Sequence, residues 1–188
     1  KAGMDIEFMF PNGLKGDLFT KELLDIMIDG GLGGMNLSLE HASPRMQKVM
    51  RKNLDVEKFR ENIQYVATKY PSVVVGLYTM HGFPTETEET FKETMDFIPK
   101  LSPDNVIFSI FTPYPGSELY YECKKMGLIE GEFDVSLYNH ASPLNCFTKN
   151  IPKERFYELR KKATKYVDNY NRRRKFKRAF KILRHNGF

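Results

Sequence analysis

The chain has 188 residues, of which 41% are hydrophobic and 28% are charged, and this composition suits one globular domain or a large piece of one. No apolar run is long enough to cross a bilayer, and the two cysteines do not form a close-spaced pair, which argues against a membrane-spanning protein and a disulfide framework. We therefore expect a reducing, cytoplasmic location. The first residue is Lys1 rather than methionine, so we expect a piece of a longer protein.

The net charge of +5 conceals an uneven distribution of charge along the chain. Residues 153–188 hold 14 lysines and arginines against 3 acidic residues, whereas residues 1–152 hold 15 against 21. The body of the chain is thus mildly acidic and the tail is strongly basic. This division argues against a general nucleic-acid-binding surface and indicates a separate role for the tail.

The first predicted unit is a strand followed by a helix. Residues 4–10 alternate polar and apolar side chains, which is typical of a strand, and Pro11-Asn12-Gly13 is expected to end it. Residues 20–28 place their leucines, Met27 and Ile28 on one side of a short amphipathic helix.

The second predicted unit begins with a strand at residues 35–39. Ser43-Pro44 is a favourable helix start, with serine as the N-cap and proline at the first helical position. A short helix over residues 45–50 and a longer one over about 55–70 are predicted to follow.

The third and fourth units repeat this order. An apolar, β-branched run begins at Val73 and ends in the turn Gly82-Phe83-Pro84, after which Thr85 and Glu88 predict a capping box and a helix over about 86–100. Residues 106–111 are nearly all apolar, as in a strand covered on both faces, and a helix is predicted over 117–125.

Four alternating strand–helix units predict an α/β fold with a parallel sheet and right-handed crossovers. A closed eight-stranded barrel needs about 250 residues, so the chain is either an open sheet or part of a barrel. Residues 1–130 are expected to form this unit, residues 131–150 an irregular connection, and residues 151–188 a basic helical extension.

Three motifs stand in one order along the chain and carry a resemblance. The segment from Glu40-His41-Ala42-Ser43 to Met50-Arg51-Lys52, the segment from Gly76 to Glu86, and the segment from Ile110 to Tyr120 resemble the fourth-, fifth- and sixth-strand motifs of the radical S-adenosylmethionine (SAM) barrel. The resemblance is to the C-terminal half of that barrel, in a subfamily that often carries an upstream cobalamin-binding domain. It implies a partial TIM-like (βα) barrel of parallel strands with outer helices.

The resemblance also implies roles for single residues. Glu40 would accept hydrogen bonds from the ribose hydroxyls of SAM, and Lys52 would meet the methionyl carboxylate. The adenine would be bordered by the remaining candidates, which are Tyr78, Met80, His81, Gly82, Ile110 and Phe111. No residue of the chain is predicted to be catalytic or to bind a metal.

The family binds a [4Fe-4S] cluster through Cys-x-x-x-Cys-x-x-Cys, and no segment of the sequence has this spacing. The resemblance therefore implies cluster ligands outside the chain, in an upstream half of the same polypeptide, with cobalamin as a further possible cofactor. The family's Glu-Ser-Gly-Ser is Glu40-His41-Ala42-Ser43 here, and a threonine, Thr85, replaces the second glycine of Gly-Phe-Pro-Gly-Glu-Thr. The chain would supply the ribose and adenine side of the SAM pocket, would not catalyse radical chemistry alone, and would leave the substrate unidentified.

Several alternatives remain open from the sequence. His41 and His81 at two strand ends can form a metal pair, although lone histidines are more often hydrogen-bonded to the backbone. Glu7 and Glu40 at adjacent strand ends can serve a cluster-free hydrolase or lyase. The basic tail, with Phe176, Phe180 and Leu183 at helical spacing, can contact nucleic acid or membrane, but packing of this apolar stripe on the barrel is favoured.

Overall fold

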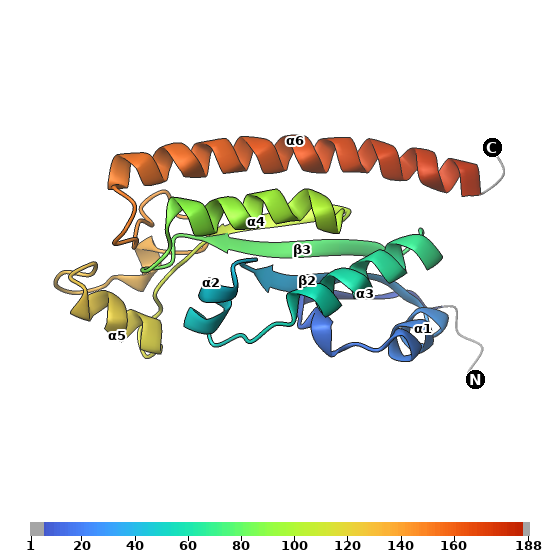
Figure 1. Ribbon diagram of the computed structural model, residues 1–188, viewed down its shortest axis with the longest axis horizontal. Coiled ribbons are helices and arrows are strands. Elements are labelled where there is room, and N and C mark those ends of the chain that lie inside the picture. The colour runs from blue at the N-terminus through green and yellow to red at the C-terminus, as the bar shows by residue number, and fades with distance from the viewer. Residues whose placement is uncertain (1–5, 186–188) are drawn as a thin grey trace.

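A computed structural model describes the backbone of residues 6–185 and the side chains up to Ala179. Its four strands form one sheet in the order β1-β2-β3-β4, and every neighbouring pair is parallel. The α/β prediction of a partial (βα) barrel is therefore confirmed (Figure 1). The strands are β1 (Phe8–Leu14), β2 (Leu32–Glu40), β3 (Val74–His81) and β4 (Asn105–Ile110).

Helices connect successive strands and cover one side of the sheet, as Figure 1 shows. The short helices α2 and α5 lie at the end of the molecule where the strands finish, and this end carries the candidate site. The helices are α1 (Lys21–Asp29), α2 (Pro44–Val49), α3 (Val56–Lys69), α4 (Glu88–Leu101), α5 (Glu118–Lys125) and α6 (Lys153–His185), with the 3₁₀ turns η1 (Gly16–Leu18) and η2 (Val135–Leu137). No helix of residues 6–185 is long and apolar enough to cross a membrane.

The main core lies between the sheet and the helices. Alternate strand residues such as Leu37 and Leu77 point to this side and are fully buried against Phe59 and Ile63 of α3 and Ile98 of α4. Side chains on a strand alternate between its two faces, so the intervening residues point to the opposite, inner face of the half-barrel.

The strand β1 continues through Pro11-Asn12-Gly13 to Leu14, so the prediction that this segment ends the strand is wrong. The pairing of β1 with β2 shifts register between Phe10 and Leu14, which accommodates the irregular residues on an edge strand. Two side chains of the inner face support this segment, because Asn36 Nδ2 and the Tyr78 hydroxyl both donate to the Pro11 carbonyl, at 2.7 and 2.9 Å.

The helix α4 begins at Glu88, and its N-cap lies two residues later than predicted. The capping box consists of Thr87 and Thr90, each side chain accepting from the other residue's backbone N–H, and the expected pair of Thr85 and Glu88 is wrong. The physical reason is Glu86, whose side chain points into the protein rather than toward the helix terminus and is fully buried.

The long helix α6 packs against the barrel through its first half. Up to Ala179, its buried residues are Phe156, Leu159, Ala163 and Val167. In the predicted apolar stripe, Phe176 is 68% exposed, and the side chains of Phe180 and Leu183 lie outside the described residues.

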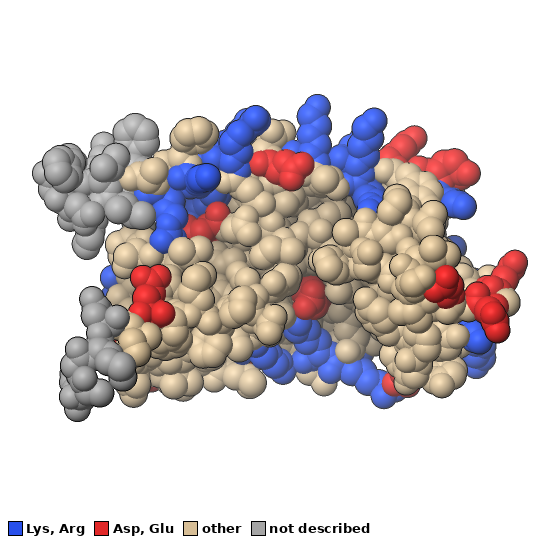
Figure 2. Space-filling view, turned by 180° about the vertical axis from the view of Figure 1, so that it is seen from behind, with Lys and Arg blue, Asp and Glu red and all other residues tan. Residues whose placement is uncertain are grey.

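Polar groups fasten the second half of α6 to the sheet. The Asn171 side chain donates to the Val106 carbonyl and accepts from the Val106 N–H, both at 2.8 Å. Arg174 and Arg178 form ion pairs with Asp104, at 3.4 and 3.3 Å. The free side of α6 is basic, and its lysines and arginines project along the upper edge of the molecule in Figure 2.

Candidate functional site

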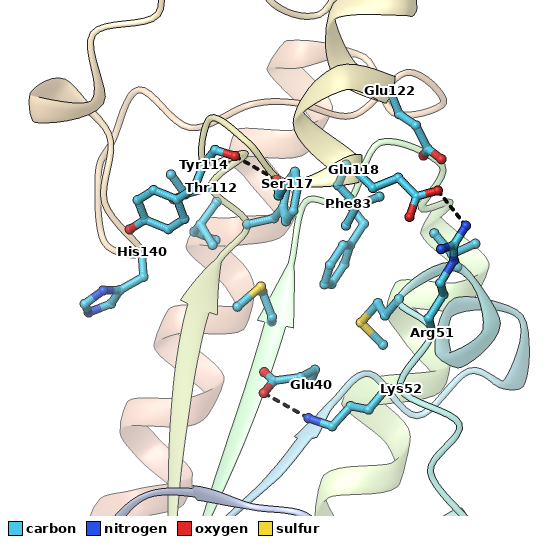
Figure 3. A pocket seen from close by; sticks show the side chains of 16 residues that line it. Glu40, Arg51, Lys52, Phe83, Thr112, Tyr114, Ser117, Glu118, Glu122 and His140 are labelled. Atoms are coloured by element: carbon cyan, nitrogen blue, oxygen red, sulfur yellow. Dashed lines mark hydrogen bonds and ion pairs between the residues drawn. The ribbon is translucent and has the colours of Figure 1, made fainter.

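A cavity of about 600 Å³ opens at the carboxyl ends of β2, β3 and β4. Ligands of parallel α/β folds bind at this end of the strands, because loop backbone groups and helix N-termini face it. The apolar part of the wall includes Met50, Met80, Phe83, Phe111 and Leu119. The polar groups include Glu40, Arg51, Lys52, Tyr114, Glu118 and His140, as Figure 3 shows.

The inner end of the cavity carries an ion pair between two predicted residues. Lys52 Nζ donates to Glu40 Oε1 at 3.2 Å, and the side chains of Lys52 and Glu40 are only 18% and 21% exposed (Figure 3). Glu40 is the last residue of β2, and Lys52 follows α2. The connection through α2 therefore returns the chain to the strand end, so that a cation and an anion lie together at the cavity wall.

The backbone at Glu40 is unusual. Its φ is +58°, in the left-handed region that residues with a side chain seldom adopt, and the pairing of β2 with β3 shifts register between Ser38 and Glu40. Gln47 of α2 supports this turn by donating to the carbonyls of Leu39 and His41, on either side of Glu40. The direction of the Glu40 carboxylate thus depends on a turn held by its neighbours.

A second ion pair crosses the outer part of the cavity. Arg51 Nη2 donates to Glu118 Oε1 at 2.5 Å and joins the segment after α2 to the first residue of α5 (Figure 3). These side chains are 75% and 55% exposed, so this pair lies in water.

The structure brings five of the eight predicted cofactor-binding residues to this cavity. They are Glu40, Lys52, Met80, Ile110 and Phe111. The Phe111 ring also packs on Phe83, with centroids 4.9 Å apart, and the Ile110 side chain contributes to the core beneath α6.

The other three predicted residues do not line the cavity. Tyr78 lies two residues before Met80 on the inner face of β3, where its hydroxyl binds Pro11. His81 points to the opposite face of β3 and is fully buried. Gly82, with φ +99°, lies close to the Phe156 ring, and a Cβ there would approach a ring carbon to 3.1 Å.

Beneath the cavity lies a buried cluster that the sequence did not reveal as a unit. Glu86 Oε1 accepts from His41 Nε2 at 3.0 Å, and Glu86 Oε2 accepts from the Gly82 N–H and lies 2.7 Å from His81 Nδ1. Burial alone would raise the pKa of Glu86, but attraction to His81 and the contacts with both histidines outweigh it and hold the pKa at about 2.

The two histidines that the sequence left open as a metal pair are both members of this cluster. His41 and His81 face one carboxylate, and among the side chains that the structure describes, up to Ala179, no group of three or more His, Cys, Asp and Glu residues is arranged to hold a metal ion. Glu7 precedes β1, at the amino ends of the strands, whereas Glu40 ends β2. A paired Glu7 and Glu40 site, which the sequence left open, is therefore wrong.

The cysteines do not fit an iron–sulfur cluster. Cys123 of α5 is fully buried, and burial raises the pKa of its thiol to about 12. Burial also raises the pKa of Cys146. A cluster needs several thiolates at one place, and the two cysteines of this sequence are both free thiols.

Comparison with known proteins bears on this site. Residues 8–98 match the family model described as the Radical SAM superfamily. The matched segment includes β1 to β3 and carries Glu40, Lys52 and Glu86.

Three curated relatives are similar over part of the chain. The ribosomal protein uS12 methylthiotransferase RimO of Aeromonas hydrophila is 35% identical over 98 residues, 52% of this chain and 22% of the relative. An uncharacterized methyltransferase of Pyrococcus horikoshii is 29% identical over 120 residues, 64% and 25% of the two chains. The tRNA-2-methylthio-N(6)-dimethylallyladenosine synthase of Thermotoga petrophila is 28% identical over 101 residues, 53% and 23%. The chain spans at most a quarter of the length of these relatives.

Proposed function

We propose that this chain forms the ribose and adenine side of the SAM pocket of a radical SAM enzyme. The observation that carries the proposal is the pair of Glu40 and Lys52, which lies at the cavity wall in a segment that matches the superfamily. A carboxylate and an ammonium group held together at the strand ends suit a ligand that offers both hydroxyl groups and a carboxylate.

The residues of the cavity fit SAM in kind and in space. The Glu40 carboxylate can accept hydrogen bonds from two ribose hydroxyls, and the Lys52 ammonium can pair with the methionyl carboxylate. The apolar wall at Met80, Phe83 and Phe111 would cover the adenine and exclude water from it. A volume of about 600 Å³ is within the usual range for small-molecule sites. Bound SAM would supply the 5′-deoxyadenosyl group for radical chemistry.

The proposal assigns the iron–sulfur cluster to protein residues outside this sequence, because the thiols of this chain do not fit it. The names of the relatives describe transfer of methylthio or methyl groups, and we propose a reaction of this kind for the whole enzyme. Neither the fold nor the comparisons support the cobalamin-binding domain that the sequence suggested, and the proposal does not include it. The 188-residue chain is expected to bind SAM without transforming it.

Calorimetric titration of the chain with S-adenosylhomocysteine tests the proposal. Glu40→Ala is expected to weaken binding about tenfold, because a charge-assisted pair of hydrogen bonds to the ribose is lost. Glu89→Ala, at an exposed position of α4, is the matched control and should bind as the wild type does. Absence of saturable binding, or equal affinity of wild type and Glu40→Ala, would overturn the proposal.

A further inference from the structure

Glu86 does not line the cavity, and the proposed function assigns it no task. We propose that Glu86 is the positioning residue of the SAM pocket, because it ties the ends of β2 and β3 together and so sets the direction of the Glu40 carboxylate. The inference rests on the proposed function, and its experiment separates the two.

The contacts of Glu86 are placed next to cavity residues in the sequence. His41 follows Glu40, and the contacts at His81 and Gly82 stand between Met80 and Phe83. Met80 and His81 are successive residues of β3 and point to opposite faces, so a contact that fixes His81 on the outer face also fixes Met80 on the inner face. His41 directly follows the last residue of β2, so a contact that fixes its ring holds the backbone next to Glu40. One carboxylate on the outer side thus holds the backbone that presents cavity residues of two strands.

The hydrogen bonds determine the orientation of the His41 ring. The Ser43 N–H donates to His41 Nδ1 at 3.1 Å, and because an amide nitrogen can only donate, Nδ1 must be the acceptor. The neutral ring therefore carries its proton on Nε2 and donates it to Glu86. Thr94 of α4, which also accepts from the Ala42 N–H, lies 2.9 Å from His41 Nδ1. Both sides of the ring are fixed.

The contact between Glu86 and His41 matters because the backbone turn at Glu40 is strained. A left-handed glutamate at a register shift is not a conformation that the strand would keep by itself, so it depends on contacts made by the residues around it. Gln47 holds the two flanking carbonyls, and Glu86 holds the side chain of the next residue, His41. Without Glu86 the turn keeps one of these two supports.

The surroundings of the cluster restrict the movement of its side chains. His41, His81 and Glu86 are fully buried, and the His81 ring lies between those of Phe91 and Phe156, with centroids 4.1 and 4.8 Å away. Displacing a buried ionised group from its donors is costly in such a medium, since no water replaces them. The carboxylate is therefore a stiff link between the two strands rather than a mobile one.

A double-mutant cycle measures whether Glu86 acts through Glu40. The affinity for S-adenosylhomocysteine is measured by calorimetry for the wild type, Glu86→Gln, Glu40→Ala and the double variant. Glu86→Gln is expected to weaken binding about tenfold in the protein that retains Glu40, but less than about twofold in the protein that already carries Glu40→Ala. An equal loss in both backgrounds would show a general structural effect and overturn the inference.

Two substitutions of His41 keep the test decisive if Glu86→Gln does not fold. His41→Gln retains an N–H donor at about the distance of Nε2, whereas His41→Asn retains an acceptor near Nδ1 but cannot reach Glu86. His41→Asn is expected to bind about tenfold more weakly than the wild type and His41→Gln within about threefold of it. The reverse order, or equal losses, would contradict the inference.

Loss of stability by itself is controlled with Leu24→Ala. Leu24 is fully buried in α1, which contributes no residue to the cavity, so this variant should melt at a lower temperature and bind the ligand unchanged. If the wild type does not bind S-adenosylhomocysteine, the proposed function fails. If Glu40→Ala weakens binding while Glu86→Gln and His41→Asn do not, only the positioning role fails.

Discussion

Two consecutive residues, Arg51 and Lys52, each form an ion pair with a glutamate, and the two pairs differ in their surroundings. Arg51 and Glu118 are 75% and 55% exposed, whereas Lys52 and Glu40 are 18% and 21% exposed. The shorter contact belongs to the exposed pair, at 2.5 Å against 3.2 Å. The shorter distance therefore does not make the exposed pair the more stabilising one, because water and salt limit the contribution of an exposed pair to at most about 1 kcal/mol.

Glu86 extends this comparison to full burial. The three carboxylates, at Glu118, Glu40 and Glu86, pass from water through the cavity wall to the core. The effect of removing one partner of the contact should increase from Glu118 to Glu40 to Glu86, since less solvent is present at each step to replace the lost contact.

Glu86→Gln is expected to give the largest loss of stability, about 2 kcal/mol of the free energy of unfolding at pH 7. A glutamine has one oxygen, so its amide group must face either the His41 Nε2–H or the Gly82 N–H and leave that donor unpaired. Urea denaturation of both proteins measures the difference.

The same pair of proteins has an expected pH dependence. The pKa of Glu86 is held at about 2, below its ordinary value of 4.5, so its stabilising contribution is present above pH 4.5 and is lost as the pH falls toward 2. The difference between wild type and Glu86→Gln should thus shrink below about pH 4.5. A difference that stays constant down to pH 3 would contradict the ionised, buried carboxylate.

Lys52→Met should have an intermediate effect, seen in ligand binding. Affinity for S-adenosylhomocysteine is expected to fall about tenfold, because the methionyl carboxylate loses its cation. Affinity for methylthioadenosine, which lacks that carboxylate, should change less than about twofold. Lys48→Met, at an exposed position of α2, serves as the control in the same calorimetric titrations. Equal losses for both ligands would remove the assignment of Lys52.

Arg51→Met should have the smallest effect. The exposed pair with Glu118 is expected to contribute less than about 0.5 kcal/mol to unfolding, and even this difference should disappear in about 0.5 M NaCl. Urea denaturation at low and high salt measures both values. A loss that persists in high salt would show that exposure does not govern these pairs.

The sequence predicted what is encoded locally. The helices predicted over about 55–70 and 117–125 are found at Val56–Lys69 and Glu118–Lys125, and each begins with an N-cap side chain that accepts from the backbone, a signal that depends only on neighbouring residues. Glu40 and Lys52 were expected to face one ligand because of a motif whose two ends are separated by one short helix, and their side chains do lie next to each other.

Features that depend on distant residues were not predicted. Glu86 stands where a helix usually begins, and its actual partners come from two other elements, so only the histidines at the strand ends gave a signal. The continuation of β1 through Pro11 depends on Asn36 and Tyr78, which no local pattern reveals. Strand alternation would have separated Met80 from His81, since neighbours on a strand cannot face the same side.

The contact of Asn171 with Val106 bears on which edge of the sheet can pair with a further strand. An amide side chain that occupies both the N–H and the carbonyl of an edge residue takes the place of a neighbouring strand, so it blocks further pairing at β4 there. At the other edge, no strand of residues 6–185 pairs with the outer side of β1. Any additional strand, from this polypeptide or another, would therefore extend the ladder at β1, and the α6 side terminates it.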